Sequence, residues 1–183
     1  DIAFENGQPT GATMEILYDG DEADNQDSGL RSPDNLDWAD DGSIVVQEDR
    51  SIGDFGLTSG EEASIWQFLS DVAGVDPLRI AQMDRDAVPT ALLGQTDGDP
   101  TDIGDWESSG ILDVSSLFGT EPGELFLFNV QAHSIRDGSI SEGDLVQGGQ
   151  LLFLDMSEFG AVPVAPSALL LLAGVPLLVR RRR

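Results

Sequence analysis

Short apolar runs separated by turn-forming residues dominate the first 160 positions of the chain. No stretch there sustains the apolar period of an amphipathic helix, whereas runs of strand length bounded by Gly, Asp or Pro recur throughout. The pattern therefore predicts an all-β fold. Strands are expected at residues 14–18, 43–47, 64–68, 78–83, 124–131 and 150–154.

Turn residues between these runs predict antiparallel hairpins. Residues 35–38 and 43–47 flank the turn 39–42, and residues 64–68 and 78–83 form a second predicted hairpin. The nearly continuous apolar strand at 124–130 is expected to be an inner strand buried on both faces. Asp-Gly pairs, which favour turns, begin at Asp19, Asp41, Asp97 and Asp137.

Residues 1–157 are expected to form one antiparallel domain. About 160 residues at about 40–50 per blade would supply three to four blades of a β-propeller, whereas propellers close with about four to eight. The expected architecture is therefore a set of antiparallel β-propeller blades from an incomplete propeller, followed by a short C-terminal hydrophobic helix. A small soluble acidic β-sandwich would explain the strands but not the C-terminal segment.

Residues 158–183 differ sharply from this domain. An apolar run at 165–179 contains Pro176 and is followed by Arg180–Arg183. The run has 15 residues, fewer than the roughly 20 that a helix needs to cross a bilayer. Terminal arginines would keep that end cytoplasmic and the acidic domain outside. The other interpretation is a buried C-terminal helix of a soluble domain.

This order of a Pro-containing motif, an apolar run and terminal arginines resembles the PEP-CTERM sorting signal, although the motif core at 162–166 lacks Glu. The resemblance implies processing by an exosortase-type enzyme, membrane contact through residues 165–183 before processing, and delivery to the cell surface or extracellular matrix of a Gram-negative bacterium. An exported protein begins with a signal peptide. The chain begins with Asp1 and has no such leader, so an upstream part is expected to be missing.

The amino-acid composition limits the kinds of binding and catalytic site that the chain can form. The chain has 34 Asp and Glu against 9 basic residues, all of them Arg, with one His, no Cys and a net charge of −25. Nucleic-acid binding is excluded because such a surface repels phosphate backbones. Disulfides, thiolate metal sites, a Cys nucleophile and multi-histidine sites are excluded as well. Carboxylates, Arg, hydroxyls and hard cations remain, and the acidity fits either a surface adapted to salty water or a set of Ca²⁺ sites.

The densest polar constellation lies at residues 32–51. Asp37, Asp41 and Glu48 match positions 1, 5 and 12 of an EF-hand loop, but a hairpin turn explains the same residues more simply. A hairpin would bring Asp34 and Asn35 to the same sheet edge as Glu48 and Asp49. Four oxygen-bearing side chains at one rim suit a hard cation, and Arg50 beside them could clamp a phosphate.

The runs "SPDNLDWADDGSIVVQEDRS", "ASIWQF", "DPTDIGDWESSGILDVSSLFG" and "LFLFNVQAHSI" resemble the C-terminal part of secreted β-propeller proteins related to PhoX-type alkaline phosphatases and phytase-like esterases. The similarity covers roughly residues 14–154. It implies a Ca²⁺-dependent phosphomonoesterase that acts on a phosphate ester, with several Ca²⁺ ions at one mouth of the propeller. PhoX-type iron is held partly by Cys, so an iron centre here would need a residue from outside this sequence.

The resemblance also assigns roles to particular residues. The metal candidates are Glu48 and Asp49, then Asn35 and Glu107; Arg50 is the phosphate contact, and His133 is a general acid or phosphate donor. Each has a structural alternative: a surface hydrogen bond for His133, a turn cap for Glu107 and a salt bridge for Arg50. The expected function is a cell-surface or secreted Ca²⁺-dependent phosphoesterase. The alternative is a non-catalytic Ca²⁺-binding matrix or adhesion propeller, because a fold does not fix a function.

Overall fold

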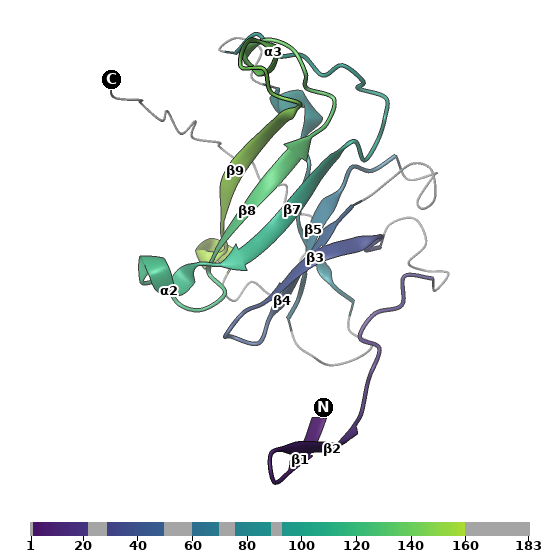
Figure 1. Ribbon diagram of the computed structural model, residues 1–183, viewed down its shortest axis with the longest axis vertical. Coiled ribbons are helices and arrows are strands. Elements are labelled where there is room, and N and C mark those ends of the chain that lie inside the picture. Colours follow the sequence, from purple (N-terminus) through teal and green to yellow (C-terminus); the bar gives the residue numbers. More distant parts are fainter. Residues whose placement is uncertain (1, 22–28, 50–59, 70–75, 89–92, 160–183) are drawn as a thin grey trace.

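The structure, a computed structural model, describes residues 2–21, 29–49, 60–69, 76–88 and 93–159. Within these residues the chain is mainly β and forms three antiparallel sheets of two, four and three strands. The two larger sheets pack against each other, and the two-stranded hairpin stands apart from them (Figure 1). The expected all-β class is confirmed.

The four-stranded sheet is a simple meander. It contains β3 (Pro33–Trp38), β4 (Ile44–Glu48), β5 (Ser64–Phe68) and β6 (Leu78–Gln82), hydrogen-bonded in chain order. Both hairpins expected from the sequence are present, since β3 pairs with β4 and β5 with β6. In the β3–β4 turn, Gly42 adopts a φ of 91°, which glycine tolerates best.

The three-stranded sheet is a second meander. Its strands are β7 (Trp106–Asp113), β8 (Leu125–Ala132) and β9 (Gly148–Asp155), with β8 in the middle. Phe126 and Phe128 on β8 are buried, but Leu127 between them is only half-buried. The expectation that this strand is buried on both faces is therefore wrong, because its outer face carries the exposed neighbours Leu112 and Phe153.

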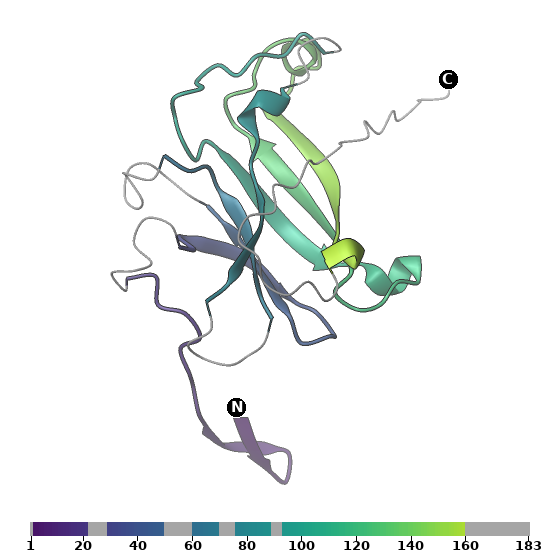
Figure 2. The ribbon, with the colours of Figure 1, turned by 180° about the vertical axis from the view of Figure 1, so that it is seen from behind.

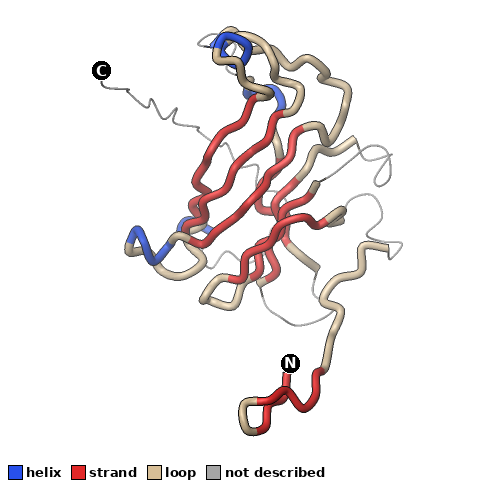
Figure 3. Tube along the Cα trace, in the orientation of Figure 1, coloured by secondary structure: helices blue, strands red, loops and turns tan. Residues whose placement is uncertain are grey.

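The remaining elements are short (Figure 3). The hairpin of β1 (Ile2–Glu5) and β2 (Gln8–Ala12) is exposed along its whole length and lies away from the large sheets in both views (Figure 2). The strand expected at 14–18 is wrong: Leu17 and Tyr18 instead pack, without strand pairing, on the outer face of the four-stranded sheet. The helical turns are η2 (Arg85–Ala87), α2 (Ser115–Phe118), α3 (Ser139–Glu142) and η3 (Ser157–Phe159).

The main core lies between the two large sheets. The four-stranded sheet contributes Val45, Ile65 and Ile80, and the three-stranded sheet contributes Phe126, Phe128 and Leu154. These side chains are almost completely buried. Burial of each such side chain stabilises the fold by about 1.5–3 kcal/mol.

At the edge of this core, β3 runs beside β7. Asn35 Nδ2 donates to Ser109 Oγ over 3.4 Å, and the Asp113 amide donates to the Asp37 carboxylate. This contact brings the start of β3 and the end of β4 close to the first residues of β7.

The expected C-terminal helix and sorting segment fall on residues 160–183, which lie outside the described residues, and both stay predictions. Among the helices of the described part, none is long and apolar enough to span a bilayer.

Gly138 and Gly119 provide a matched test of backbone strain. Both have positive φ, but a Cβ at Gly138 would lie 2.2 Å from the Leu93 carbonyl oxygen, whereas a Cβ at Gly119 would meet nothing within 4 Å. Gly119→Ala should cost about 1 kcal/mol of unfolding free energy, and Gly138→Ala about 2–3 kcal/mol or more. Urea unfolding measures both, and equal losses would contradict the close approach at Gly138.

Candidate functional site

Three of the six residues expected at a site meet around one hollow. Asp49 directly follows β4, Glu107 is the second residue of β7, and His133 directly follows β8. They line a space of about 310 Å³ together with Asp102 and Asp105. Main-chain hydrogen bonds fix this arrangement, from the Asp49 amide to the Ser32 carbonyl (3.0 Å) and from the His133 amide to the Asp105 carbonyl (3.3 Å).

A chain of hydrogen bonds connects the titratable groups of this hollow. The Glu107 carboxyl is hydrogen-bonded to the Asp49 carboxylate, and Glu107 Oε1 lies 3.2 Å from His133 Nε2. On the other side of the imidazole, His133 Nδ1 lies 2.8 Å from Gln147 Oε1. Since both ring nitrogens face oxygen acceptors, the protonated imidazolium satisfies the geometry best.

The pKa values of these groups reflect their surroundings. Burial, together with the hydrogen bond and charge of Asp49, raises the pKa of Glu107 to about 7 despite the opposing effect of His133. Burial would lower the pKa of His133, but its hydrogen bonds to Gln147 and Glu107 and the nearby Asp105 charge outweigh it and raise that pKa. A group such as Glu107, whose pKa lies near neutral pH, can exchange a proton with a bound molecule.

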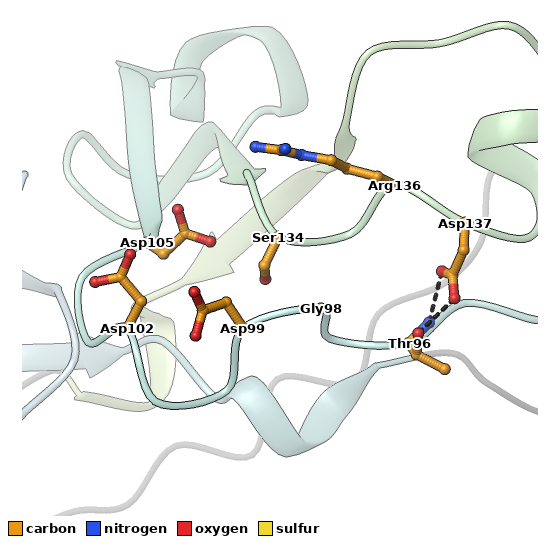
Figure 4. A pocket seen from close by; sticks show the side chains of 8 residues that line it. All are labelled: Thr96, Gly98, Asp99, Asp102, Asp105, Ser134, Arg136 and Asp137. Atoms are coloured by element: carbon orange, nitrogen blue, oxygen red, sulfur yellow. Dashed lines mark hydrogen bonds between the residues drawn. The ribbon is translucent and has the colours of Figure 1, made fainter.

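A second, adjoining hollow of about 460 Å³ shares Asp102 and Asp105 with the first. Figure 4 shows Asp99, Asp102 and Asp105 on one loop, while Arg136 extends over the same space from the segment after β8. The Arg136 Nε donates to the His133 carbonyl over 2.9 Å, which ties this arginine to the first hollow. The combined surface therefore presents several carboxylates and one guanidinium.

Glu48 lies in a different setting from Asp49. Its side chain is fully buried, and its two oxygens accept the main-chain N–H groups of Arg31 (2.7 Å) and Ser64 (2.9 Å). These bonds join the segment before β3 to the start of β5. The role of Glu48 as a metal ligand stays a prediction, but its local structural role as a brace is evident.

Asn35, another of the expected residues, is not among the residues that line the hollow. Asn35 uses its amide to donate to Asp34 and to Ser109, at the edge where β3 meets β7. Arg50 lies outside the described residues, so its expected phosphate contact stays a prediction.

The donor chemistry of the hollow fits a hard cation, because carboxylate oxygens dominate its lining. Within the described ranges, no group of three or more His, Asp and Glu side chains is already arranged to hold a metal ion. The best-defined chemical feature of the hollow is the chain of hydrogen-bonded side chains from Asp49 through Glu107 to His133, which we call the relay.

Sequence reasoning missed Asp102, Asp105, Arg136 and Gln147. The repeated carboxylates of "DGDPTDIGD" at 97–105 could have indicated a site. The sequence of a polar loop does not indicate, however, which of its side chains face a hollow and which face open solvent. Gln147 had no signal, because it reaches His133 only through the fold.

Comparison with known proteins identifies no relative, so the function has to be inferred from the geometry of the site. No protein-family model, curated protein or solved structure matches the chain.

Removing the charge of Glu48 should destabilise the fold. Glu48→Gln replaces one acceptor of a buried pair of hydrogen bonds with an amide donor, so the free energy of unfolding should fall by about 1.5–3 kcal/mol. Asp40→Asn, at an exposed carboxylate in the β3–β4 turn, is the control and should change it much less. Chemical unfolding followed by circular dichroism checks this, and equal effects would show that Glu48 is not a brace.

Glu107 and His133 should make stability fall as pH rises. Both have folded pKa values above their ordinary ones, so the stabilisation that each contributes is present at low pH. The Glu107 contribution is lost between its ordinary 4.5 and about 7, and that of His133 above its ordinary 6.5.

Glu107→Gln should therefore flatten the dependence of unfolding free energy on pH in the Glu107 window. Urea unfolding between about pH 5 and pH 8 measures this slope. An unchanged slope would mean that Glu107 ionises as an ordinary surface carboxylate.

Proposed function

We propose that the chain is part of a secreted or cell-surface Ca²⁺-dependent phosphoesterase that hydrolyses a phosphate ester. The observation that carries the proposal is the meeting of Asp49, Glu107 and His133, from three separate segments, around one carboxylate-lined hollow. The resemblance of the sequence to PhoX-type and phytase-like propeller proteins favours phosphate chemistry over other uses of such a hollow.

In this proposal each group has a distinct task. Asp49 and Glu107, with Asp102 and Asp105 beside them, supply the oxygens that would hold Ca²⁺. Bound Ca²⁺ would neutralise charge on the phosphoryl oxygens. His133, protonated between Glu107 and Gln147, can donate a proton to the leaving oxygen of the ester.

Ca²⁺ binding and protonation of Glu107 should compete. Because the pKa of Glu107 is raised to about 7, Ca²⁺ binding below that pH has to displace a proton from its carboxyl group. The increase in melting temperature on adding Ca²⁺ should therefore be larger at about pH 8 than at about pH 5. A Ca²⁺ effect that does not depend on pH would place the cation elsewhere.

We also propose that the two large sheets are neighbouring blades of an incomplete β-propeller. Three observations support this: both sheets are meanders in chain order, they pack through a shared core, and their first strands β3 and β7 lie side by side. The exposed outer face of β7–β9, with Leu112, Leu151 and Phe153, would suit another layer.

For residues 158–183 we propose a sorting segment that contacts the membrane through 165–183 and is processed by an exosortase-type enzyme. The apolar run and the terminal arginines support this role. The mass of the protein recovered from the cell surface tests it, since processing removes the arginines and an intact C-terminus contradicts it.

A second candidate function is a non-catalytic Ca²⁺-binding matrix or adhesion module. It is favoured by the excess of carboxylates over the cationic groups His133 and Arg136 in the two described hollows. A phosphoesterase has to attract an anion, whereas a binding module does not.

Hydrolysis of p-nitrophenyl phosphate by the full-length gene product separates the two candidates. We expect turnover that a chelator abolishes and that His133→Gln lowers about 100-fold or more. Asp155→Asn, at the far end of β9, is the control and should leave turnover unchanged. A folded protein whose melting temperature rises with Ca²⁺ but which shows no turnover would be the binding module, and chelator-resistant turnover would contradict the Ca²⁺ requirement.

A further inference from the structure

The guanidinium of Arg85 lies inside a cage of oxygen atoms. Its Nε and Nη2 bind both oxygens of the Asp97 carboxylate at 2.8 and 2.9 Å. The main-chain carbonyls of Asp99 (2.5 Å to Nη2) and Asp102 accept from the same group. Longer contacts reach Ser134 Oγ at 3.4 Å and Glu62 Oε1 at 3.5 Å.

This cage is largely closed to solvent. The side chains of Arg85 and Asp97 are only 9% and 10% exposed. The guanidinium carbon lies 5.6 Å from the centre of the Trp106 ring, on which it stacks. The Trp106 indole N–H donates to Ser134 Oγ (2.8 Å), which in turn donates to Asp97 (2.6 Å).

The surrounding loop has the composition of a cation-binding loop. Residues 97–105 read Asp-Gly-Asp-Pro-Thr-Asp-Ile-Gly-Asp, and such carboxylates and carbonyls are the ligands that hard cations prefer. In this loop the Asp97 carboxylate and the Asp99 and Asp102 carbonyls are directed at Arg85. The guanidinium thus occupies the centre that a bound cation would take in such a loop.

We propose that Arg85 is a built-in cation that orders the loop 97–105 and thereby holds Asp102 and Asp105 at the hollow beside Glu107 and His133. Arg85 is a positioning residue, because it acts on the hollow through the loop. The inference rests on the proposed function only in treating this hollow as the site.

The carboxylates of the loop have two different roles: one binds Arg85, and the others line the hollow. Asp97 is used inside the cage: burial would raise its pKa, but the hydrogen bonds from Ser134 and Arg85 outweigh burial and lower it. Glu62 adds a second brace, because its other oxygen accepts the Gly104 N–H at 2.9 Å. The carboxylates of Asp102 and Asp105 belong to the lining of the hollow.

The main-chain hydrogen bonds of the loop make this proposal measurable without substrate or metal. The Asp102 amide donates to the Asp99 carbonyl, and the Gly104 amide donates to the Glu62 carboxylate. The His133 amide donates to the Asp105 carbonyl over 3.3 Å and so links the loop to the hollow. Release of the loop would expose these amides and speed their hydrogen exchange with solvent.

The experiment compares Arg85→Ala with Arg79→Ala by amide hydrogen exchange followed by NMR. Arg79 is a close match, because it also stacks on a tryptophan, Trp66 at 4.8 Å, and pairs with a carboxylate, Glu61. We expect Arg85→Ala to cause a loss of protection at the loop amides and at the His133 amide, and added guanidinium ion, well below denaturing concentration, to restore that protection. Arg79→Ala should leave the exchange of these amides unchanged even if it lowers the melting temperature.

Asp97→Asn is a second variant, which removes the charged two-point partner of Arg85 while leaving the arginine in place, and it should cause the same loss of protection. Wild-type exchange of the loop amides in Arg85→Ala, or in Asp97→Asn should Arg85→Ala fail to fold, overturns the proposal. So does an equal loss of protection in Arg79→Ala, which would reflect a general loss of structure. Failure of the phosphoesterase proposal would appear separately, as absence of turnover and Ca²⁺ binding in the wild-type protein.

Discussion

The packing of the four-stranded sheet against the three-stranded sheet is the contact on which the candidate site depends. Hydrophobic side chains from both sheets fill the space between them, and β3 comes to lie beside β7. This places Asp49, at the end of β4, next to Glu107 at the start of β7. His133 joins them because β8 is paired with β7 from Phe126 to Ala132 and ends opposite Trp106. None of these three residues is near another in the sequence, so the relay exists only while the two sheets remain packed.

The cost of burying a charge explains why the buried carboxylates of the chain are so firmly partnered. Glu48 accepts two main-chain amides, and Asp97 binds the Arg85 fork. Burial would raise the pKa of Asp113, but hydrogen bonds from Ser115 and the Gly123 amide outweigh it and lower that pKa. Such partners allow a carboxylate to keep its charge away from water. Glu107 instead lies against the Asp49 carboxylate, and burial together with that neighbour raises the pKa of Glu107 to about 7, which is costly for stability and useful for binding a cation or moving a proton.

Local sequence determined much of the fold but only part of the site. The β3–β4 and β5–β6 hairpins were predictable because alternating apolar residues flank turn residues such as Gly42. The approach of Glu48 and Asp49 to the start of β3 followed from the same hairpin. The orientation of these two residues was not predictable, since adjacent strand positions face opposite sides and only the packing of the sheets determines which side is buried. The role of Arg85 depends on carbonyl groups of a loop with no periodicity, so no pattern of residue types indicates it.

The central claim is that the packed sheets hold Glu107 against the Asp49 carboxylate at the hollow and thereby raise the pKa of Glu107 to about 7. The direct measurement is a carbon-13 NMR titration of the glutamate side-chain carboxyls, with the Glu107 signal assigned by its loss in Glu107→Gln. The account predicts that Glu107 titrates near pH 7, and that Asp49→Asn, which removes the opposing charge, moves this titration to lower pH. Titration of Glu107 near its ordinary value of 4.5, with no response to Asp49→Asn, would contradict it.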